Sequence, residues 1–253
     1  MPTPLDVGFV LLFTVVLPVF DMLYFVPRFK ADAKAGVPGA RLRAYRRTVV
    51  GQWGFAFAAA FIWMRARRPW SDLGVVPLGL AGVIGGTMIV ALMGAFTIHQ
   101  ARAIGRLTPD RREALRPKLD YVEYLLPHSR SEFEWFTALS ITAGVCEELL
   151  CRGFLLWVLE AYVGIALAAV IGVALFGVLH LYQGRQGAIK AAVAGAVMTL
   201  IYLATHWLFP AMVVHALVDF SGGKLGFHVL GNSRPDKVIG PRELRDASVT
   251  PAG

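Results

Sequence analysis

The chain is a succession of long apolar stretches separated by shorter polar segments. A helix needs about 20 largely apolar residues to cross the hydrocarbon core of a membrane. By that criterion the pattern predicts membrane helices at residues 7–26, 48–64, 78–98, 134–162, 164–182, 188–205 and 210–222. The last stretch is short, and a further half-helix to Leu230 would complete it. We therefore predict an all-α fold, a polytopic transmembrane bundle of about seven to eight helices.

No soluble block of domain size interrupts these stretches. The sequence thus predicts a single transmembrane helical domain over residues 1–231, with a core at about 134–222 that carries the motifs discussed below. Residues 232–253 are rich in Pro, Asp, Arg and Ser and predict a mobile cytoplasmic tail. Composition agrees with a membrane protein, because only 17% of the residues are charged, against roughly 25% in soluble domains.

The basic residues alternate between the segments that join the apolar stretches. Along the chain these segments carry seven, three, seven, none, two and none, where the two include Lys190 at the start of the stretch 188–205. Five more cations follow from Lys224 onward. The positive-inside rule then predicts an outer N-terminus and a cytoplasmic C-terminus. This distribution also explains the net charge of +8 without a nucleic-acid partner. An Ala-, Gly- and Arg-rich membrane protein of this size suits a prokaryotic inner (plasma) membrane, with membrane lipid as its first partner.

Three charged residues lie inside the apolar run 141–158, namely Glu147, Glu148 and Arg152. A charge at the centre of a membrane helix costs about 2.5 to 3.5 kcal/mol on insertion scales, so each needs a reason. Glu148 and Arg152 are four residues apart and can form a supporting ion pair on one helix face. Glu147 points about 100° away and lacks that partner.

Two later helices carry further polar pairs spaced by four residues. Phe176 precedes His180, and His215 precedes Asp219, so each pair shares a helix face. Together the motifs read EExxxR, FxxxH and HxxxD. We expect Glu147 and these ionisable groups to gather around one wet pocket, since isolated charges in lipid are costly. Glu147, His180, His215 and Asp219 also have the ligand types of a zinc or other divalent metal site.

These residues resemble the CPBP intramembrane proteases, which include the CAAX prenyl endopeptidases and bacteriocin-processing relatives. The resemblance covers mainly residues 142–219, through the segments 147–152, 176–180 and 215–219. It implies a glutamate-dependent endopeptidase in which Glu147 is the general base and His180 helps to activate a water. His215 and the residue at Asp219 would stabilise the oxyanion.

The resemblance does not decide the role of Asp219, the fourth candidate residue, or whether the site binds a metal. Many relatives carry Asn where this chain has Asp219, and an ionised carboxylate cannot donate to an oxyanion. Asp219 is then either protonated or orients His215, or all four residues bind a divalent metal such as zinc, as in a metalloprotease. The favoured interpretation is metal-free hydrolysis that requires no cofactor.

The sequence lacks the motifs of other intramembrane hydrolases, since it contains no HExxH, GxSG or GxGD. The leading hypothesis is hydrolysis of a peptide bond in a membrane-associated or lipidated peptide or protein substrate. One alternative is a non-catalytic membrane immunity or accessory protein that keeps the polar cluster for helix packing. Another is a proton or metal transporter that uses the same cluster. The substrate, its prenylation and the oligomeric state are left open.

Overall fold

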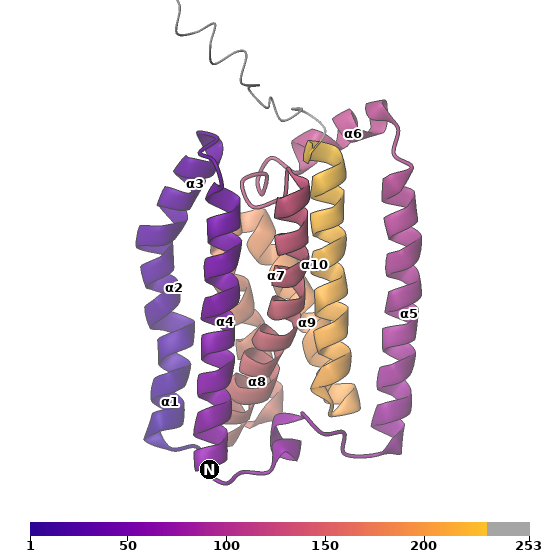
Figure 1. Cartoon of the computed structure of the whole chain (residues 1–253). Coiled ribbons are helices and arrows are strands. Elements are labelled where there is room, and N and C mark those ends of the chain that lie inside the picture. Colours follow the sequence, from indigo (N-terminus) through magenta and orange to yellow (C-terminus); the bar gives the residue numbers. More distant parts are fainter. Residues whose placement is uncertain (232–253) are drawn as a thin grey trace, which may run out of the picture.

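The computed structural model describes residues 1–231, and every regular element within them is helical. The predicted tail, 232–253, lies outside the described residues. Figure 1 shows the long helices running side by side, with the N-terminus at one end and the short helix α6 (Pro109–Leu115) at the other. The all-α bundle predicted from the hydropathy pattern is confirmed.

The first membrane helix is one continuous run made of three labelled parts. They are α1 (Pro4–Leu11), α2 (Leu17–Phe20) and α3 (Val26–Lys34), and wider π-helical turns join them. α2 and α3 each begin with a proline near the first turn. Proline lacks a backbone N–H, so the regular ladder is interrupted there and the helix widens instead of ending.

The remaining helices are long, and the longest connections between them are residues 66–79 and 106–129. They are α4 (Ala40–Arg65), α5 (Leu80–Gly105), α7 (Arg130–Glu148), α8 (Leu156–Leu179), α9 (Gly184–Thr205) and α10 (Leu208–Leu230). α7 continues into α8 through a π-helical segment, Leu149–Leu155, and α8 breaks at Gly164, whose φ is +75°. Residues 1–231 therefore contain seven long helices, as predicted.

Most helices are longer than their apolar stretches. α4 begins eight residues before the predicted start at Thr48, and α10 is one continuous helix from Leu208 to Leu230. The predicted helical continuation from Gly222 to Leu230 is thus present, as part of α10 and not as a separate half-helix, and several predicted boundaries differ. Hydropathy marks the part of a helix inside the hydrocarbon, whereas backbone hydrogen bonding continues into the polar interface.

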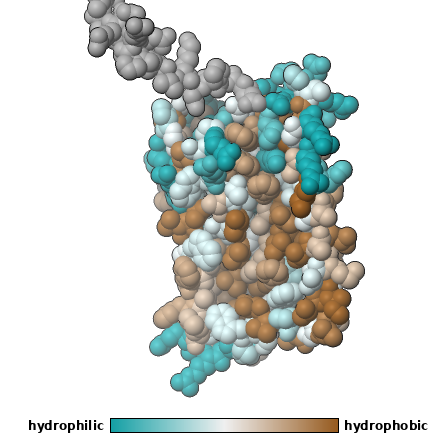
Figure 2. Space-filling model, turned by 45° about the vertical axis from the view of Figure 1, so that its right-hand side comes forward, coloured by the Kyte–Doolittle hydropathy of each residue, from teal (hydrophilic) through white to brown (hydrophobic). Residues whose placement is uncertain are grey.

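The surface of the bundle is that of an integral membrane protein. Four helical segments are long and apolar enough to cross a membrane, at Pro4–Lys34, Leu80–Gly105, Arg130–Leu179 and Leu181–Thr205. Figure 2 shows hydrophobic residues over the middle of the visible face and hydrophilic residues gathered towards its upper end. Large apolar side chains such as Leu92 and Leu200 are exposed because lipid, rather than water, would surround them.

α7 is the central helix of the bundle, packed between α4 and α10. The contact with α10 is close because Gly144 lies against its backbone: a Cβ atom at Gly144 would stand 2.6 Å from the carbonyl oxygen of Met212. Small residues allow this approach in membrane helices. Two residues that the motifs singled out, Glu147 and His215, lie next to this contact.

Candidate active site

α7 begins at a sequence-encoded cap and ends at the paired glutamates. The Ser129 hydroxyl accepts a hydrogen bond from the backbone N–H of Glu132, and the Glu132 carboxylate accepts one from the N–H of Ser129. This capping box fixes where the helix starts. Glu147 and Glu148 are its last two residues, and the π-helical segment with Arg152 follows directly. Such π-helical segments often occur at functional sites.

Glu148 is the fully buried anchor of the site. Its Oε1 accepts hydrogen bonds from Nη1 of Arg152 at 3.0 Å and from Nδ1 of His215 at 2.6 Å. The predicted ion pair between Glu148 and Arg152 is therefore confirmed, and the structure adds His215 as a third member. Arg152 also donates to the carbonyl oxygen of Gly195, and its guanidinium lies 4.4 Å above the ring of Phe176. Both bonds to Glu148 are made by Oε1, whereas its Oε2 has no hydrogen-bond partner among the described residues. A buried charge is tolerated only when it is paired in this way.

The hydrogen bonds of the two histidines define which ring nitrogen faces the site. Nδ1 of His180 donates to the carbonyl oxygen of Phe176 at 2.8 Å, because a carbonyl can only accept. Nδ1 of His215 likewise donates to the carboxylate of Glu148. In both rings Nε2 is thus the atom left for chemistry.

Glu147 brings these atoms together. Its Oε2 lies 4.0 Å from Nε2 of His180 and 4.0 Å from Nε2 of His215. Asp219 completes the group, with Oδ2 at 3.6 Å from Nε2 of His215. All four candidate residues therefore converge, from α7, the end of α8, and α10. The separations are too long for direct hydrogen bonds and leave room for small groups between the side chains.

The site is open on one side and closed on the other. The side chain of Glu148 is 0% exposed, that of Glu147 is 21% exposed and that of Asp219 is 39% exposed. The anchoring pair therefore lies beneath the reactive groups, away from anything that approaches them. A substrate would meet Glu147 and Asp219 first.

One contact residue was missed by sequence reasoning. Nε2 of Gln52, on α4, donates a hydrogen bond of 2.6 Å to Oε1 of Glu147. A neutral amide draws less attention than a charge, and Gln52 lies in the first half of the chain, where no motif was found. The feature that could have identified Gln52 is that it is an amide side chain within the otherwise apolar stretch 48–64.

The candidate ligand atoms lie somewhat further apart than the ligands of a tetrahedral zinc ion. Two ligands at about 2.0 to 2.1 Å from a tetrahedral zinc are roughly 3.4 Å apart. The pairs of candidate ligand atoms here are 3.6 to 4.0 Å apart. Within residues 1–231, no group of three or more His, Cys, Asp or Glu side chains is arranged to hold a metal ion. Metal binding by these four residues stays a prediction.

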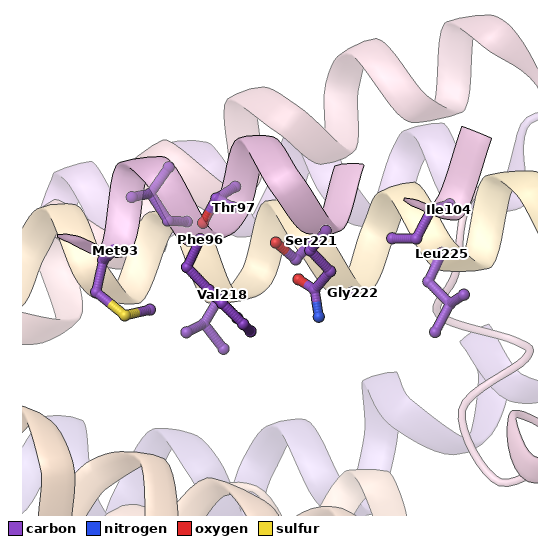
Figure 3. Close-up of a pocket in the computed structure, with 10 residues that line it drawn as sticks. Met93, Phe96, Thr97, Ile104, Val218, Ser221, Gly222 and Leu225 are labelled. Atoms are coloured by element: carbon purple, nitrogen blue, oxygen red, sulfur yellow. The ribbon is translucent and has the colours of Figure 1, made fainter. Parts of the chain in front are cut away.

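A separate cavity of about 230 Å³ lies between α5 and α10. Figure 3 shows mainly apolar side chains around it, among them Met93 and Phe96 of α5 and Val218 and Leu225 of α10. None of the four candidate residues lines it. The polar site and this cavity are thus different features of α10.

Comparison with known protein families shows that residues 129–221 match a family model. The family is described as type II CAAX prenyl endopeptidase Rce1-like. Residues 129–221 form an Rce1-like domain. This finding confirms the resemblance to the CPBP proteases that the motifs indicated. Comparisons with curated proteins and with solved structures gave no match.

The Rce1-like domain runs from the cap of α7 to the middle of α10, so it contains all four candidate residues together with Glu148 and Arg152. α1 to α5 lie outside it. One contact of the candidate site nevertheless comes from outside the domain, because Gln52 lies on α4.

Proposed function

We propose that the protein is an intramembrane endopeptidase that hydrolyses a peptide bond in a membrane-associated or lipidated substrate. The observation that carries this proposal is the position of Glu147, whose Oε2 is 4.0 Å from Nε2 of both His180 and His215 in an otherwise apolar bundle. The presence of an Rce1-like domain over the same residues supports it.

Glu147 and His180 are the groups that would activate a water. A water at about 2.8 Å from both Oε2 of Glu147 and Nε2 of His180 would subtend an angle of about 90°, close to that of a normal two-bonded water. It would donate one hydrogen to each acceptor, which leaves its lone pairs free to attack a carbonyl carbon. Glu147 takes the proton during the attack and returns it to the leaving amine.

His215 and Asp219 are the groups that would stabilise the tetrahedral intermediate. Glu148 holds Nδ1 of His215, so a doubly protonated ring presents its Nε2–H to the developing oxyanion. Asp219 lies beside the same nitrogen and is the more exposed residue. In protonated form it would add a second donor, and in ionised form it would orient His215.

These steps use only side chains of the chain, so the proposal needs no resident cofactor. A divalent metal such as zinc is the alternative for the same four residues. It would act as a Lewis acid towards the carbonyl oxygen, and it would require the ligand atoms to move closer together than they lie here.

The proposed orientation has the N-terminus outside and the C-terminus in the cytoplasm, in a prokaryotic inner membrane. It rests on the alternation of basic segments along the chain. The proposed partners are membrane lipid and a membrane-bound peptide or protein. Because the matched family is described by CAAX prenyl endopeptidase activity, a farnesylated CAAX peptide is the first probe.

The test uses purified protein in liposomes and an internally quenched farnesylated CAAX peptide, beside the same peptide without the farnesyl group. Wild-type protein is expected to cleave at least one of them, and Glu147→Ala and His180→Ala are expected to lose cleavage while they remain folded. If both variants retain the wild-type rate, the proposal is wrong.

The non-catalytic alternative makes the opposite prediction. If the cluster served only helix packing, Glu147→Ala would weaken the fold, and any activity would follow the amount of folded protein. The contacts favour catalysis, because the packing bonds are made by Glu148 and Arg152 whereas Glu147 bonds only to Gln52 among the described residues. A proton or metal flux assay in the same liposomes tests the transporter alternative.

A further inference from the structure

Gln52 is a partly buried amide that hydrogen-bonds to one of the four candidate residues. It lies on α4, outside the Rce1-like domain, and donates through Nε2 to Oε1 of Glu147 at 2.6 Å. Its own Oε1 is buried without a hydrogen-bond partner among the described residues. An unsatisfied buried polar atom costs about 1 to 3 kcal/mol. A residue kept for packing alone would avoid this cost by being apolar.

The contact determines how the carboxylate of Glu147 is turned. One oxygen, Oε1, is occupied by Gln52, and the other, Oε2, faces Nε2 of His180 and of His215. A glutamate side chain has three rotatable bonds before its carboxylate, so without such a restraint the two oxygens could exchange or the group could turn away. Gln52 therefore leaves one defined oxygen to take the proton.

The position of Gln52 is itself held by neighbouring contacts between α4 and α7. The indole N–H of Trp53 donates to the hydroxyl of Thr142 at 3.2 Å, and the ring of Tyr45 packs edge-on against Phe136. These contacts fix the register of α4 against α7 on both sides of the amide. The restraint on Glu147 is thus built into the helix packing.

We propose that Gln52 is a positioning residue that holds Glu147 in the orientation required for hydrolysis. This inference rests on the proposed endopeptidase function. It extends the working site beyond the Rce1-like domain to α4, which would act on the chemistry through the orientation of Glu147.

The test measures kcat and KM of Gln52→Leu with the farnesylated peptide in liposomes. Leucine is similar in size but cannot donate, so kcat should fall roughly 10- to 100-fold, because small misplacements of a catalytic group have effects of this order. KM should change by less than about threefold, since the lost bond orients Glu147 for the chemical step and is not proposed to bind substrate. Gln100→Leu on α5 makes the same chemical change away from the site and should keep the wild-type kcat.

A second variant, Gln52→Asn, tests the inference if Gln52→Leu folds poorly. Gln52→Asn keeps a polar amide but is one methylene shorter, about 1.5 Å, and its donor should fall short of Glu147. We expect a similar loss of kcat. A double-mutant cycle adds a signature of indirect action: in the Glu147→Asp background, Gln52→Leu should have less than half of its effect on log kcat.

The outcomes separate this inference from the proposed function. If wild-type protein cleaves, Glu147→Ala does not, and folded Gln52→Leu and Gln52→Asn keep kcat within twofold of wild type, the inference is wrong and the protease proposal stands. A loss of thermal stability with an unchanged kcat would also overturn it. If Glu147→Ala cleaves as fast as wild-type protein, the proposed function itself fails.

Discussion

Adding one methyl group at Gly144 should separate the catalytic residues without touching them. A Cβ atom there would lie 2.6 Å from the carbonyl oxygen of Met212 and 2.9 Å from the backbone nitrogen of Ala216, both on α10. Backbone atoms cannot rotate away as a side chain can. An ordinary contact begins at 3.4 Å, so α7 and α10 would have to part by about 0.8 Å at this point.

The helices would part close to two residues of the site. Glu147 is three residues further along α7 than Gly144, and His215 directly precedes Ala216 on α10. The 4.0 Å separation of Oε2 and Nε2 would grow, and the 2.6 Å hydrogen bond between Glu148 and His215 would stretch. A displacement of about 1 Å can cost roughly 100-fold in rate. Overpacking of this kind also costs about 1 to 3 kcal/mol of stability. We therefore expect Gly144→Ala to fold, to be moderately less stable, and to lose about 100-fold in kcat/KM.

The assay is cleavage of the quenched farnesylated peptide in liposomes, normalised to the folded fraction from size-exclusion chromatography and thermal unfolding in detergent. Gly172→Ala is the matched control, because it adds the same methyl group to an apolar helix where nothing lies within 4 Å of the new atom. The reasoning is refuted if folded Gly144→Ala cleaves within threefold of Gly172→Ala.

Three further predictions concern the charges. Arg152→Leu leaves the buried Glu148 without its ion-pair partner and should lower the free energy of unfolding by about 3 to 5 kcal/mol. An unchanged unfolding temperature would contradict this. Arg68→Leu removes the bidentate ion pair with Asp6, whose two hydrogen bonds are 2.7 and 2.8 Å long, and should lower the unfolding temperature. The kcat per folded molecule should stay at the wild-type value, because neither residue belongs to the site. Asp219→Asn should keep kcat within about threefold, since an amide can donate to the oxyanion, whereas Asp219→Leu should lose at least tenfold; equal losses would mean that the carboxylate itself is needed.

The helices were predictable because lipid demands long apolar stretches. Hydropathy placed the start of α7 at residue 134, however, and did not detect the capping box that sets the observed start at Arg130. Convergence of the four candidate residues was also predictable, since spacings of four residues align side chains and isolated charges in a membrane are costly. The exact ends of α4 and α10 were not, because polar residues continue a helix into the interface without any change in hydropathy that marks its end.

Contacts between helices distant in the sequence were beyond prediction. The bond from His215 to Glu148 depends on how α10 is rotated against α7, and spacing along one helix gave Glu148 only Arg152 as a partner. Gln52 was missed for a similar reason, because its partner is 95 residues away and its side chain carries no charge. The cavity between α5 and α10 likewise arises only from tertiary packing.

The most direct measurement is single-turnover cleavage of the farnesylated peptide in water enriched in ¹⁸O, followed by mass spectrometry of the product and of the protein. Wild-type protein should place one ¹⁸O atom in the new carboxylate of the product and none in Glu147, and Glu147→Gln should form no product. Product formation by folded Glu147→Gln at the wild-type rate, or ¹⁸O in Glu147 itself, would contradict a water activated by this carboxylate.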